Sequence, residues 1–199
     1  MDVMKRAPED RTETATQILD VAEQLVQIRG FNAFSYADVA AELEITKAAL
    51  HYHFATKADL GEALVTRYAA RFAGALAAVE LSHATAPAQL EAYANLYLAV
   101  LREKRMCLCG MLAAESPTLP ITMQDAVVRF FNDNEAWLTD VLSRGRDEGT
   151  LDFAGTPAEA AQMLVGGLEG AMLVARPFGD IGRFQAVADQ LLASLRPTG

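Results

Sequence analysis

The sequence predicts an all-α protein of about nine helices, and three observations carry that prediction. Alanine and leucine are abundant while runs of Val, Ile and Thr are scarce, which favours helices over sheet. Apolar residues recur at helical spacing, and several of these stripes follow a Ser or Thr with an acid three residues later, which is typical of a helix start. With 52 % hydrophobic residues and seven prolines, the chain can bury a sizeable core.

The N-terminal helices are short and closely spaced. An apolar stripe predicts a helix over about residues 10–29, and Gly30 follows it where a left-handed residue commonly ends a helix. Ser35 and Asp38 then form a capping pair that opens a short second helix.

A third short helix follows after a tight turn. Thr46 is a good N-cap, and only residues 43–45 separate it from the second helix. The third helix extends to about His53. Helix, short helix, tight turn and short helix in this order form the helix-turn-helix arrangement, so we expect residues 1–56 to form one helix-turn-helix domain.

The remaining residues, 57–199, predict a larger helical domain. Its strongest start signal, TPAE at 156–159, combines an N-cap, a proline at the first helical position and a glutamate at the third. The first helix of this domain begins at Lys57 and joins the two domains without a linker. The expected helices cover about residues 57–80, 87–103, 121–146, 157–176 and 180–195, with a short piece broken by Gly110, Pro117 and Pro120.

Charge and composition limit the functional classes. The chain has 17 Lys and Arg against 26 Asp and Glu, a net charge of −9, and its first 60 residues are acidic too, with six cations against ten acids. A general nucleic-acid binder would instead carry a basic patch. Any contact with DNA must therefore come from a local surface.

The sequence predicts a cytoplasmic protein with no membrane partner. The N-terminus has two cations but no apolar stretch after them, so it does not match a secretory signal. The longest apolar window, residues 160–175, is shorter than the roughly 20 residues that span a bilayer. In a reducing compartment, the two cysteines are not expected to form a structural disulfide.

The segment ITKAALHYHFATK, residues 45–57, contains two lysines, two histidines and a tyrosine but no acid. The first residues of a recognition helix meet base edges in the major groove, and neighbouring donors bind phosphates. Thr46, Lys47 and Ala48 hold those first positions, and the further donors are His51, Tyr52, His53 and Lys57. The alternative is a surface helix with a charged rim. The two histidines lie two positions apart and point away from each other, so we expect no metal site there.

The longer segment FSYADVAAELEITKAALHYHFATKADL resembles the DNA-binding signature of the TetR family of bacterial transcriptional regulators. The shared features, within about residues 12–60, are a Ser/Thr-rich helix start, a short turn, a K-x-x-L recognition helix, a His-Phe pair and a later Lys-x-x-L. The resemblance implies a ligand-responsive homodimeric regulator, usually a repressor, that leaves a pseudo-palindromic double-stranded DNA operator when a small-molecule effector binds. It also implies that DNA is faced by Ser35, Tyr36, Thr46, Lys47, Ala48, Tyr52, His53 and Lys57.

Two positions depart from the family pattern. The turn usually contains glycine where this chain has Glu44, and a left-handed glutamate costs roughly 1 kcal/mol more, so we expect a different turn geometry. The usual tyrosine after K-x-x-L is His51 here, with the aromatic residue one place later at Tyr52. Either of these two residues can be the phosphate contact.

The resemblance also implies that the last two helices form a four-helix bundle with the same two helices of the second subunit in the homodimer. Helix 157–176 supports such packing because small residues alternate with large apolar ones, and glycine in a helix is otherwise unfavourable by about 1 kcal/mol. We expect the interface to include Met163, Gly167, Gly170 and Ala171. The alternative is an intramolecular hairpin with the final helix.

Aromatic residues of the middle helices are candidates for an effector pocket. Tyr93 and Tyr97 are four apart and share a helix face, while Phe130 and Trp137 come from the long helix. An apolar cavity with a few polar tips is the usual composition of a ligand site. The alternative for each residue is ordinary core packing.

The CLCG segment at 107–110 is a candidate sensor. Arg102, Lys104 and Arg105 precede it, and cations near a thiol favour the thiolate, so Cys107 or Cys109 could react with an electrophile or oxidant. The alternative is two small buried apolar residues. A metal site is disfavoured because no further ligands cluster there, and we expect no cofactor.

Two other functional classes stay open at this point, although we expect the protein not to be an enzyme. A thiol-dependent redox enzyme using C-x-C lacks a nearby general base, because His83 is the only histidine outside the third helix. Cysteine-dependent peroxide turnover would favour that class. The second class is a small-molecule binding module without DNA binding. If Lys47→Ala changes no cellular phenotype, that result favours these two classes over a DNA-binding regulator.

Overall fold

The computed structural model describes residues 8–197, and this range contains nine α-helices and one short 3-10 helix, which confirms the all-α prediction. Each long helix begins and ends within two residues of its expected bounds. None of the helices in this range combines the length and apolar character that a bilayer-spanning segment needs. The elements are α1 Pro8–Arg29, α2 Tyr36–Glu42, α3 Lys47–His53, α4 Lys57–Ser82, α5 Ala86–Arg102, α6 Leu108–Ala114, η1 Ser116–Thr118, α7 Ile121–Asp147, α8 Pro157–Phe178 and α9 Ile181–Ala193.

Helix α8 differs from the expectation at its end. It was expected to end before Pro177, but it includes this proline and ends at Phe178. A proline in the last turn removes only one hydrogen bond at an end that frays. The stop is set instead by Gly179, which has φ +60 and donates its N–H to the Arg176 carbonyl at 3.0 Å.

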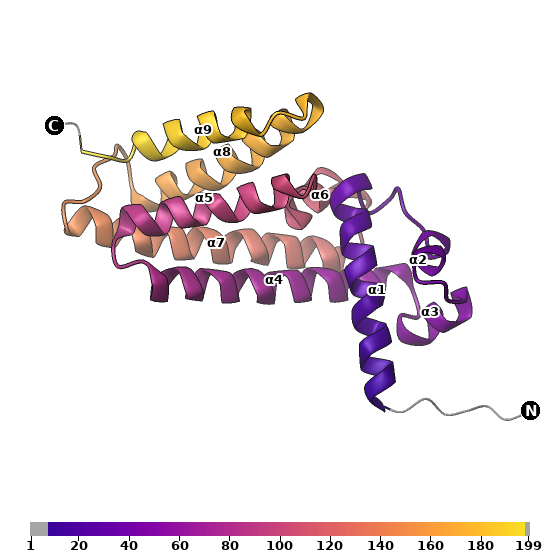
Figure 1. Cartoon of the computed structure of the whole chain (residues 1–199). Helices are drawn as coiled ribbons and strands as arrows, with labels where there is room; N and C mark the ends of the chain where they lie inside the picture. Colours follow the sequence, from indigo (N-terminus) through magenta and orange to yellow (C-terminus); the bar gives the residue numbers. More distant parts are fainter. Residues whose placement is uncertain (1–7, 198–199) are drawn as a thin grey trace, which may run out of the picture.

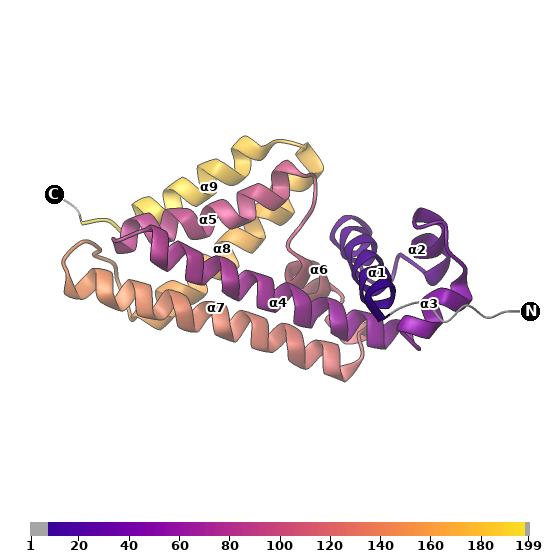
Figure 2. The ribbon, with the colours of Figure 1, turned by 60° about the horizontal axis from the view of Figure 1, so that its bottom comes forward.

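The helices form an elongated molecule with the three N-terminal helices at one end. Helices α4, α5, α7, α8 and α9 form a long bundle, while α1 crosses its end steeply and α2 and α3 lie beyond α1 (Figures 1 and 2). In the bundle α7 packs against α8 and α4, and α9 packs against α8 and α5. One apolar core runs through both regions and includes Leu50 of α3 as well as Phe184 of α9.

Polar contacts also join α1 to the bundle. Glu23 of α1 is only 4 % exposed and accepts hydrogen bonds from Arg67, at 2.9 Å, and from Arg71 on α4. The Glu115 carboxylate, just after α6, accepts from the Phe31 N–H at 2.6 Å. Because these groups are wholly or partly buried, their pairing holds the orientation of α1 as well as its position.

The start of α4 is clamped between two other segments. A Cβ added at Gly61 would lie 2.4 Å from the Met123 sulfur of α7 and 2.8 Å from the Phe31 ring, so only glycine allows this approach. Interiors this closely packed transmit displacements. A shift of α7 against α4 would therefore reach the helices at the N-terminal end.

Candidate DNA-binding surface and effector region

Helix α3 is anchored by one face and exposed on the other. Leu50 is fully buried and fixes the helix on the core. Thr46 caps its start, with Oγ1 accepting from the Ala49 N–H at 3.1 Å. Lys47 and Ala48, in the first turn, are exposed. The first turn of α3 therefore faces outward, as a recognition helix requires.

The turn before α3 corrects one expectation. Glu44 adopts the left-handed conformation, with φ +53, so the predicted departure in turn geometry is wrong. The left-handed conformation of this glutamate costs roughly 1 kcal/mol of folding free energy. It persists because backbone hydrogen bonds on both sides hold the turn. The Ile45 N–H reaches the Ala40 carbonyl at 3.0 Å, and the Leu43 N–H reaches the Val39 carbonyl at 3.2 Å.

Tyr36 has a structural position. It is 8 % exposed, and its hydroxyl donates to the carbonyls of Phe54 at 2.9 Å and Thr56 at 2.5 Å. Burial, helped by the charge of Asp59, raises the pKa of Tyr36 to about 12. The side chain therefore joins the start of α2 to the turn between α3 and α4.

Lys57 is also held inside the N-terminal unit. Its ammonium group donates to the carbonyls of Phe31 and Phe34, each at 2.5 Å, and lies over both rings, 4.6 and 4.3 Å from the centroids. Partial burial lowers the pKa of Lys57, opposed by the charges of Glu115 and Asp38. This lysine therefore ties the start of α4 to the loop between α1 and α2.

The structure separates the three ring residues at the end of α3. His51 is exposed, but its Nδ1 lies 3.0 Å from the Ala55 carbonyl and its ring lies against Tyr36, 4.7 Å between centroids. Tyr52 is 62 % exposed, whereas His53 is half-buried and packs edge-on against Tyr52 at 5.4 Å. Both candidate phosphate contacts, His51 and Tyr52, are therefore exposed.

A shallow groove of about 430 Å³ brings the starts of α2 and α3 together. Ser35, at the start of α2, caps that helix and donates its hydroxyl to Asp38 at 2.7 Å. Ala37 also lines the groove and was missed by sequence reasoning, although its place in the first turn of α2, beside Ser35, was a usable signal. The groove residues are Phe34, Ser35, Tyr36, Ala37, Lys47, His51 and Lys57.

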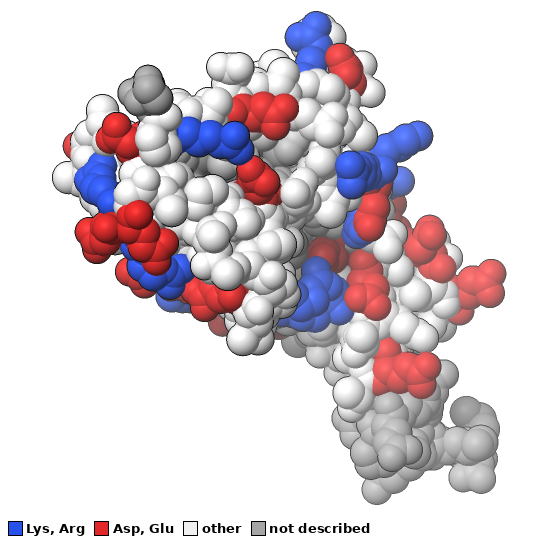
Figure 3. All heavy atoms as spheres, turned by 60° about the vertical axis from the view of Figure 1, so that its left-hand side comes forward, with Lys and Arg blue, Asp and Glu red and all other residues white. Residues whose placement is uncertain are grey.

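Figure 3 brings forward the end of the bundle that lies opposite α2 and α3 in Figure 1, and on this face Lys and Arg lie interspersed with Asp and Glu, with no broad field of one sign among the described residues. Acids also occur on α2 and in the turn after it: Asp38 is 3.9 Å from Arg29, and Glu42 and Glu44 are exposed. Within residues 8–197 no acid lines the groove, and the exposed first turn of α3 supplies the cation Lys47.

The four aromatic residues expected to line an effector pocket form a packed cluster. Tyr93, Tyr97 and Phe130 are 1–2 % exposed, and Trp137 stacks on Tyr93 with 5.7 Å between centroids. The Tyr93 hydroxyl lies 3.0 Å from that of Tyr97 and donates to Asn134 Oδ1 at 3.3 Å. In this structure these residues belong to the core.

The two cysteines are buried, which corrects the expected thiolate character. Cys107 and Cys109 are 2 % and 0 % exposed. Burial first, and then the nearby Glu169 carboxyl, raise the pKa of both thiols well above the usual value. The cations that precede the cysteines are not among the causes of these shifts, and they line a pocket described below. Sequence reasoning also missed Glu169, whose own pKa burial raises to about 7.

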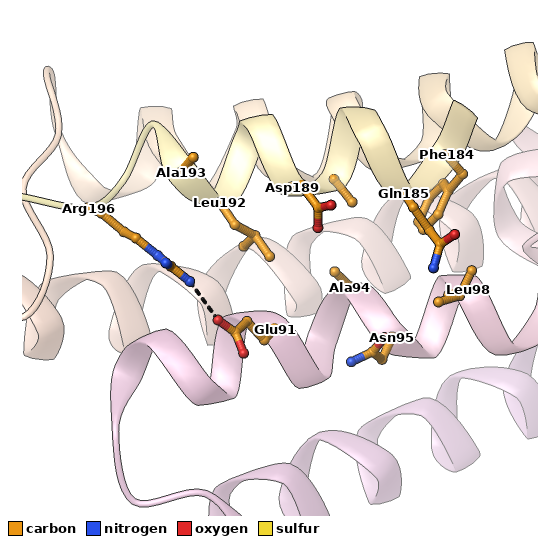
Figure 4. A pocket seen from close by; sticks show the side chains of 11 residues that line it. Glu91, Ala94, Asn95, Leu98, Phe184, Gln185, Asp189, Leu192, Ala193 and Arg196 are labelled. Atoms are coloured by element: carbon orange, nitrogen blue, oxygen red, sulfur yellow. Dashed lines mark hydrogen bonds and ion pairs between the residues drawn. The ribbon is translucent and has the colours of Figure 1, made fainter. Parts of the chain in front are cut away.

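A second groove, of about 350 Å³, lies between α5 and α9. Arg196 reaches across it to Glu91 at 2.7 Å, while Asp189 and Gln185 of α9 face Ala94 and Asn95 of α5 (Figure 4). The Glu91–Arg196 ion pair bridges the groove and neutralises the charge of Arg196.

The four residues expected at a dimer interface divide into two groups. Met163 and Gly170 are exposed, and a Cβ at Gly170 would meet nothing within 4 Å. Ala171 is buried, and a Cβ at Gly167 would lie 2.6 Å from Leu191 of α9. The intramolecular hairpin with α9 therefore accounts for Gly167.

Comparisons with known proteins agree in sequence and in fold. The family model for "Bacterial regulatory proteins, tetR family" matches residues 18–64, and the model for "Tetracyclin repressor-like, C-terminal domain" matches residues 86–191. The transcriptional repressor NemR of Escherichia coli K12 is 27 % identical over 170 residues, which cover 82 % of this chain and 84 % of NemR.

Solved structures give the same result. A TetR-family regulator from Agrobacterium tumefaciens is 33 % identical, with a TM-score of 0.91 over 94 % of this chain and 100 % of that one. The reduced form of E. coli NemR has the same fold, with a TM-score of 0.81 at 24 % identity over 94 % of this chain and 100 % of that one. Matches to two family models, a helix-turn-helix with an exposed third helix, and a helical bundle behind it lead to one conclusion: this chain belongs to the TetR family of bacterial transcriptional regulators.

Proposed function

We propose that this TetR-family regulator is a homodimeric repressor that leaves a pseudo-palindromic operator when a small molecule binds. The observation that carries the proposal is the first turn of α3, where Lys47 and Ala48 are exposed and free of acid while Leu50 holds the helix on the core. We assign DNA binding to residues 1–56, of which 1–7 lie outside the described part, and effector binding and dimerisation to residues 57–199.

Within the helix-turn-helix we distinguish two groups. The exposed side chains contact DNA directly: Ser35, Thr46, Lys47, Ala48, His51 and Tyr52. The remaining three, Tyr36, His53 and Lys57, position the helices that bear the contacts. A lysine at the start of α3 can donate to guanine, and an exposed tyrosine hydroxyl can donate to a phosphate.

An exposed apolar stripe on α8 supports the homodimer. Leu173, Val174 and Phe178 are 58–60 % exposed, and they continue along the helix from Met163 and Gly170. Exposed apolar patches of this kind mark protein interfaces. A two-fold dimer through this stripe would present two recognition helices about 34 Å apart, one turn of DNA.

Cysteine sensing is a second, finer proposal. It is supported by the relation to NemR, one structure of which is of its reduced form. In this chain Cys107 caps α6, with its sulfur 3.5 Å from the Gly110 N–H, so modifying it would disturb the start of that helix. Because both thiols are buried with raised pKa values, we expect slow reaction unless α6 opens.

The cysteine proposal is tested by the release of DNA after treatment with N-ethylmaleimide. Cys107→Ser or Cys109→Ser should abolish the response. An unchanged response in both single variants and in the double variant would exclude it.

DNA binding is tested by fluorescence anisotropy with a duplex from upstream of the protein's own gene, beside a scrambled duplex. Tight binding to the native duplex should weaken with salt at a log–log slope of about −0.9 per phosphate neutralised. Lys47→Ala should cost about 1–3 kcal/mol of binding free energy.

The matched control is Arg129→Ala, which removes the same charge from an exposed position on α7. It should leave binding unchanged. Equal losses in both variants would show a non-specific charge effect and contradict the assignment of α3 as the recognition helix.

A further inference from the structure

Four cations line one pocket at the junction of the bundle with α1. The pocket has a volume of about 480 Å³ and lies between the C-terminal ends of α5 and α8 and the start of α9. Arg102, Lys104 and Arg105 come from the end of α5 and the loop after it, and Arg176 comes from α8; Leu101 and Ile181 supply apolar walls. The volume is in the range of small-molecule sites.

The pocket has an excess of positive charge. Arg102 and Lys104 are exposed and form no ion pair within residues 8–197, whereas Arg105 pairs with Glu103. Asp180 is the one carboxylate in the lining, and it is already engaged: it caps α9 through the Gly182 N–H at 2.9 Å. An anion entering the pocket would therefore meet cations whose charge is not fully matched.

Lys104 holds its cation at a strained position. It has φ +59, at the end of α5, where glycine is the ordinary choice. Lysine is less stable than glycine in this left-handed conformation. The lysine therefore places a positive charge at the pocket although glycine would make the backbone more stable there.

Two of the pocket cations also bind α1. Arg105 donates to the Gln27 side-chain oxygen at 3.1 Å, and Arg176 donates to the Ile28 carbonyl. Gln27 and Ile28 belong to the last turns of α1, the helix that carries α2 and α3 behind it. The same guanidinium groups therefore face both the pocket and the N-terminal helices.

We infer that this pocket binds a small amphipathic anion, a carboxylate or phosphate on a short apolar chain, which draws Arg105 and Arg176 away from α1. Arginine forms its strongest hydrogen bonds with such groups, so the anion would compete well against the uncharged partners on α1, a side-chain amide and a backbone carbonyl. Arg105 would keep its ion pair with Glu103. The apolar chain would lie on Leu101 and Ile181. This inference rests on the proposed function, because it names the effector class and the route to the recognition helix.

The binding arm of the test needs no DNA. Octanoate and octyl phosphate are titrated into the full-length protein by calorimetry, beside acetate and 1-octanol, which carry only the head or only the chain. At least one of the two amphiphiles should saturate at a single site below about 1 mM, with acetate and octanol at least tenfold weaker. No saturable binding of either amphiphile would overturn the inference.

Two variants place the binding in this pocket. Arg102→Gln and Lys104→Gly should each weaken the anion about tenfold, the usual effect of losing one charge-assisted contact. Lys104→Gly also relieves the left-handed strain, so its thermal midpoint should rise or stay the same and misfolding cannot explain a loss of affinity. Arg129→Gln, on α7 outside the pocket, should bind the anion normally. Equal binding by all variants would place the anion elsewhere and overturn the inference.

The DNA arm tests the route to α1. Adding the anion to the protein–DNA complex should lower DNA affinity, and saturating DNA should lower anion affinity by the same factor, because coupling is reciprocal. Anion binding without any change in DNA affinity would overturn the competition for Arg105 and Arg176. If the protein binds no DNA, the proposed function fails while the calorimetric result stands on its own.

Discussion

Glu44 shows how a single backbone conformation is imposed by its surroundings. The residue sits at φ +53 in the turn between α2 and α3, where glycine would be less strained. The neighbouring backbone hydrogen bonds of Ile45 and Leu43 hold the turn in this conformation. The turn therefore carries a local cost that substitution can remove.

Glu44→Gly should stabilise the protein by about 0.5–1 kcal/mol, since relief of the left-handed strain exceeds the entropy that glycine loses on folding. The measurement is the urea midpoint of unfolding. Glu42→Gly is the matched control, because Glu42 ends α2 in a right-handed conformation. That variant should destabilise by a similar amount, and a gain in both would contradict the strain at Glu44.

Glu169 is a partly buried acid with a buried carboxylate oxygen, so its charge is unfavourable. It lies on α8, close to Cys107, and its Oε1 has no hydrogen-bond partner. Burial raises its pKa from 4.5 to about 7. The folded protein therefore holds a proton between these two pH values that the unfolded chain has already released.

This difference predicts that stability falls as the pH rises from about 4.5 to 7, by on the order of 3 kcal/mol, because the folded state binds more protons there. Glu169→Gln should remove that slope in thermal unfolding measured between about pH 5 and 8. Glu159→Gln is the control: the pKa of this exposed cap is lowered, so its titration ends below this window. Identical slopes in wild type and Glu169→Gln would contradict the raised pKa.

At the scale of elements, the helix-turn-helix is held by caps and by contacts distant in sequence. Thr46 and Thr56 cap α3 and α4 from within three residues, so these helix starts could be predicted from local sequence. Tyr36 and Lys57 could not be placed in this way. Their partners lie 18–26 residues away, and the tertiary arrangement turns both side chains inward instead of toward DNA.

Tyr36→Phe tests the contact between these elements. It keeps the ring but leaves the carbonyls of Phe54 and Thr56 without the hydroxyl, which should destabilise the protein by about 1–3 kcal/mol. DNA affinity should fall as well, because the end of α3 loosens. The measurement pairs chemical unfolding with anisotropy. Unchanged stability with weaker DNA binding would instead indicate that the hydroxyl contacts DNA directly.

At the scale of the whole molecule, the apolar stripe on α8 is a surface that one chain leaves uncovered. Met163, Leu173, Val174 and Phe178 are 42–60 % exposed along it. Gly166 and Gly170 have open space at their Cβ positions, so close packing within this chain does not require them. A second copy would give both observations a common cause.

Val174→Asp should dissociate the homodimer, since it places a charge in an apolar interface, and DNA affinity should fall with it. Sedimentation velocity measures the assembly directly. Val128→Asp is the matched control, because Val128 on α7 is 57 % exposed against 58 % for Val174. Equal dissociation by both variants, or by neither, would contradict an interface on α8.

The sequence by itself determined the long helices, with bounds to within two residues, and the start of α3 at its cap, because caps, glycine stops and apolar periodicity act over a few residues. Only the tertiary structure decided the roles of side chains whose partners lie far along the chain. It buried the two cysteines beside Glu169 and packed the expected pocket aromatics into the core. It also brought Arg176 within reach of Ile28, 148 residues away, because bundle packing rather than local sequence sets such neighbours.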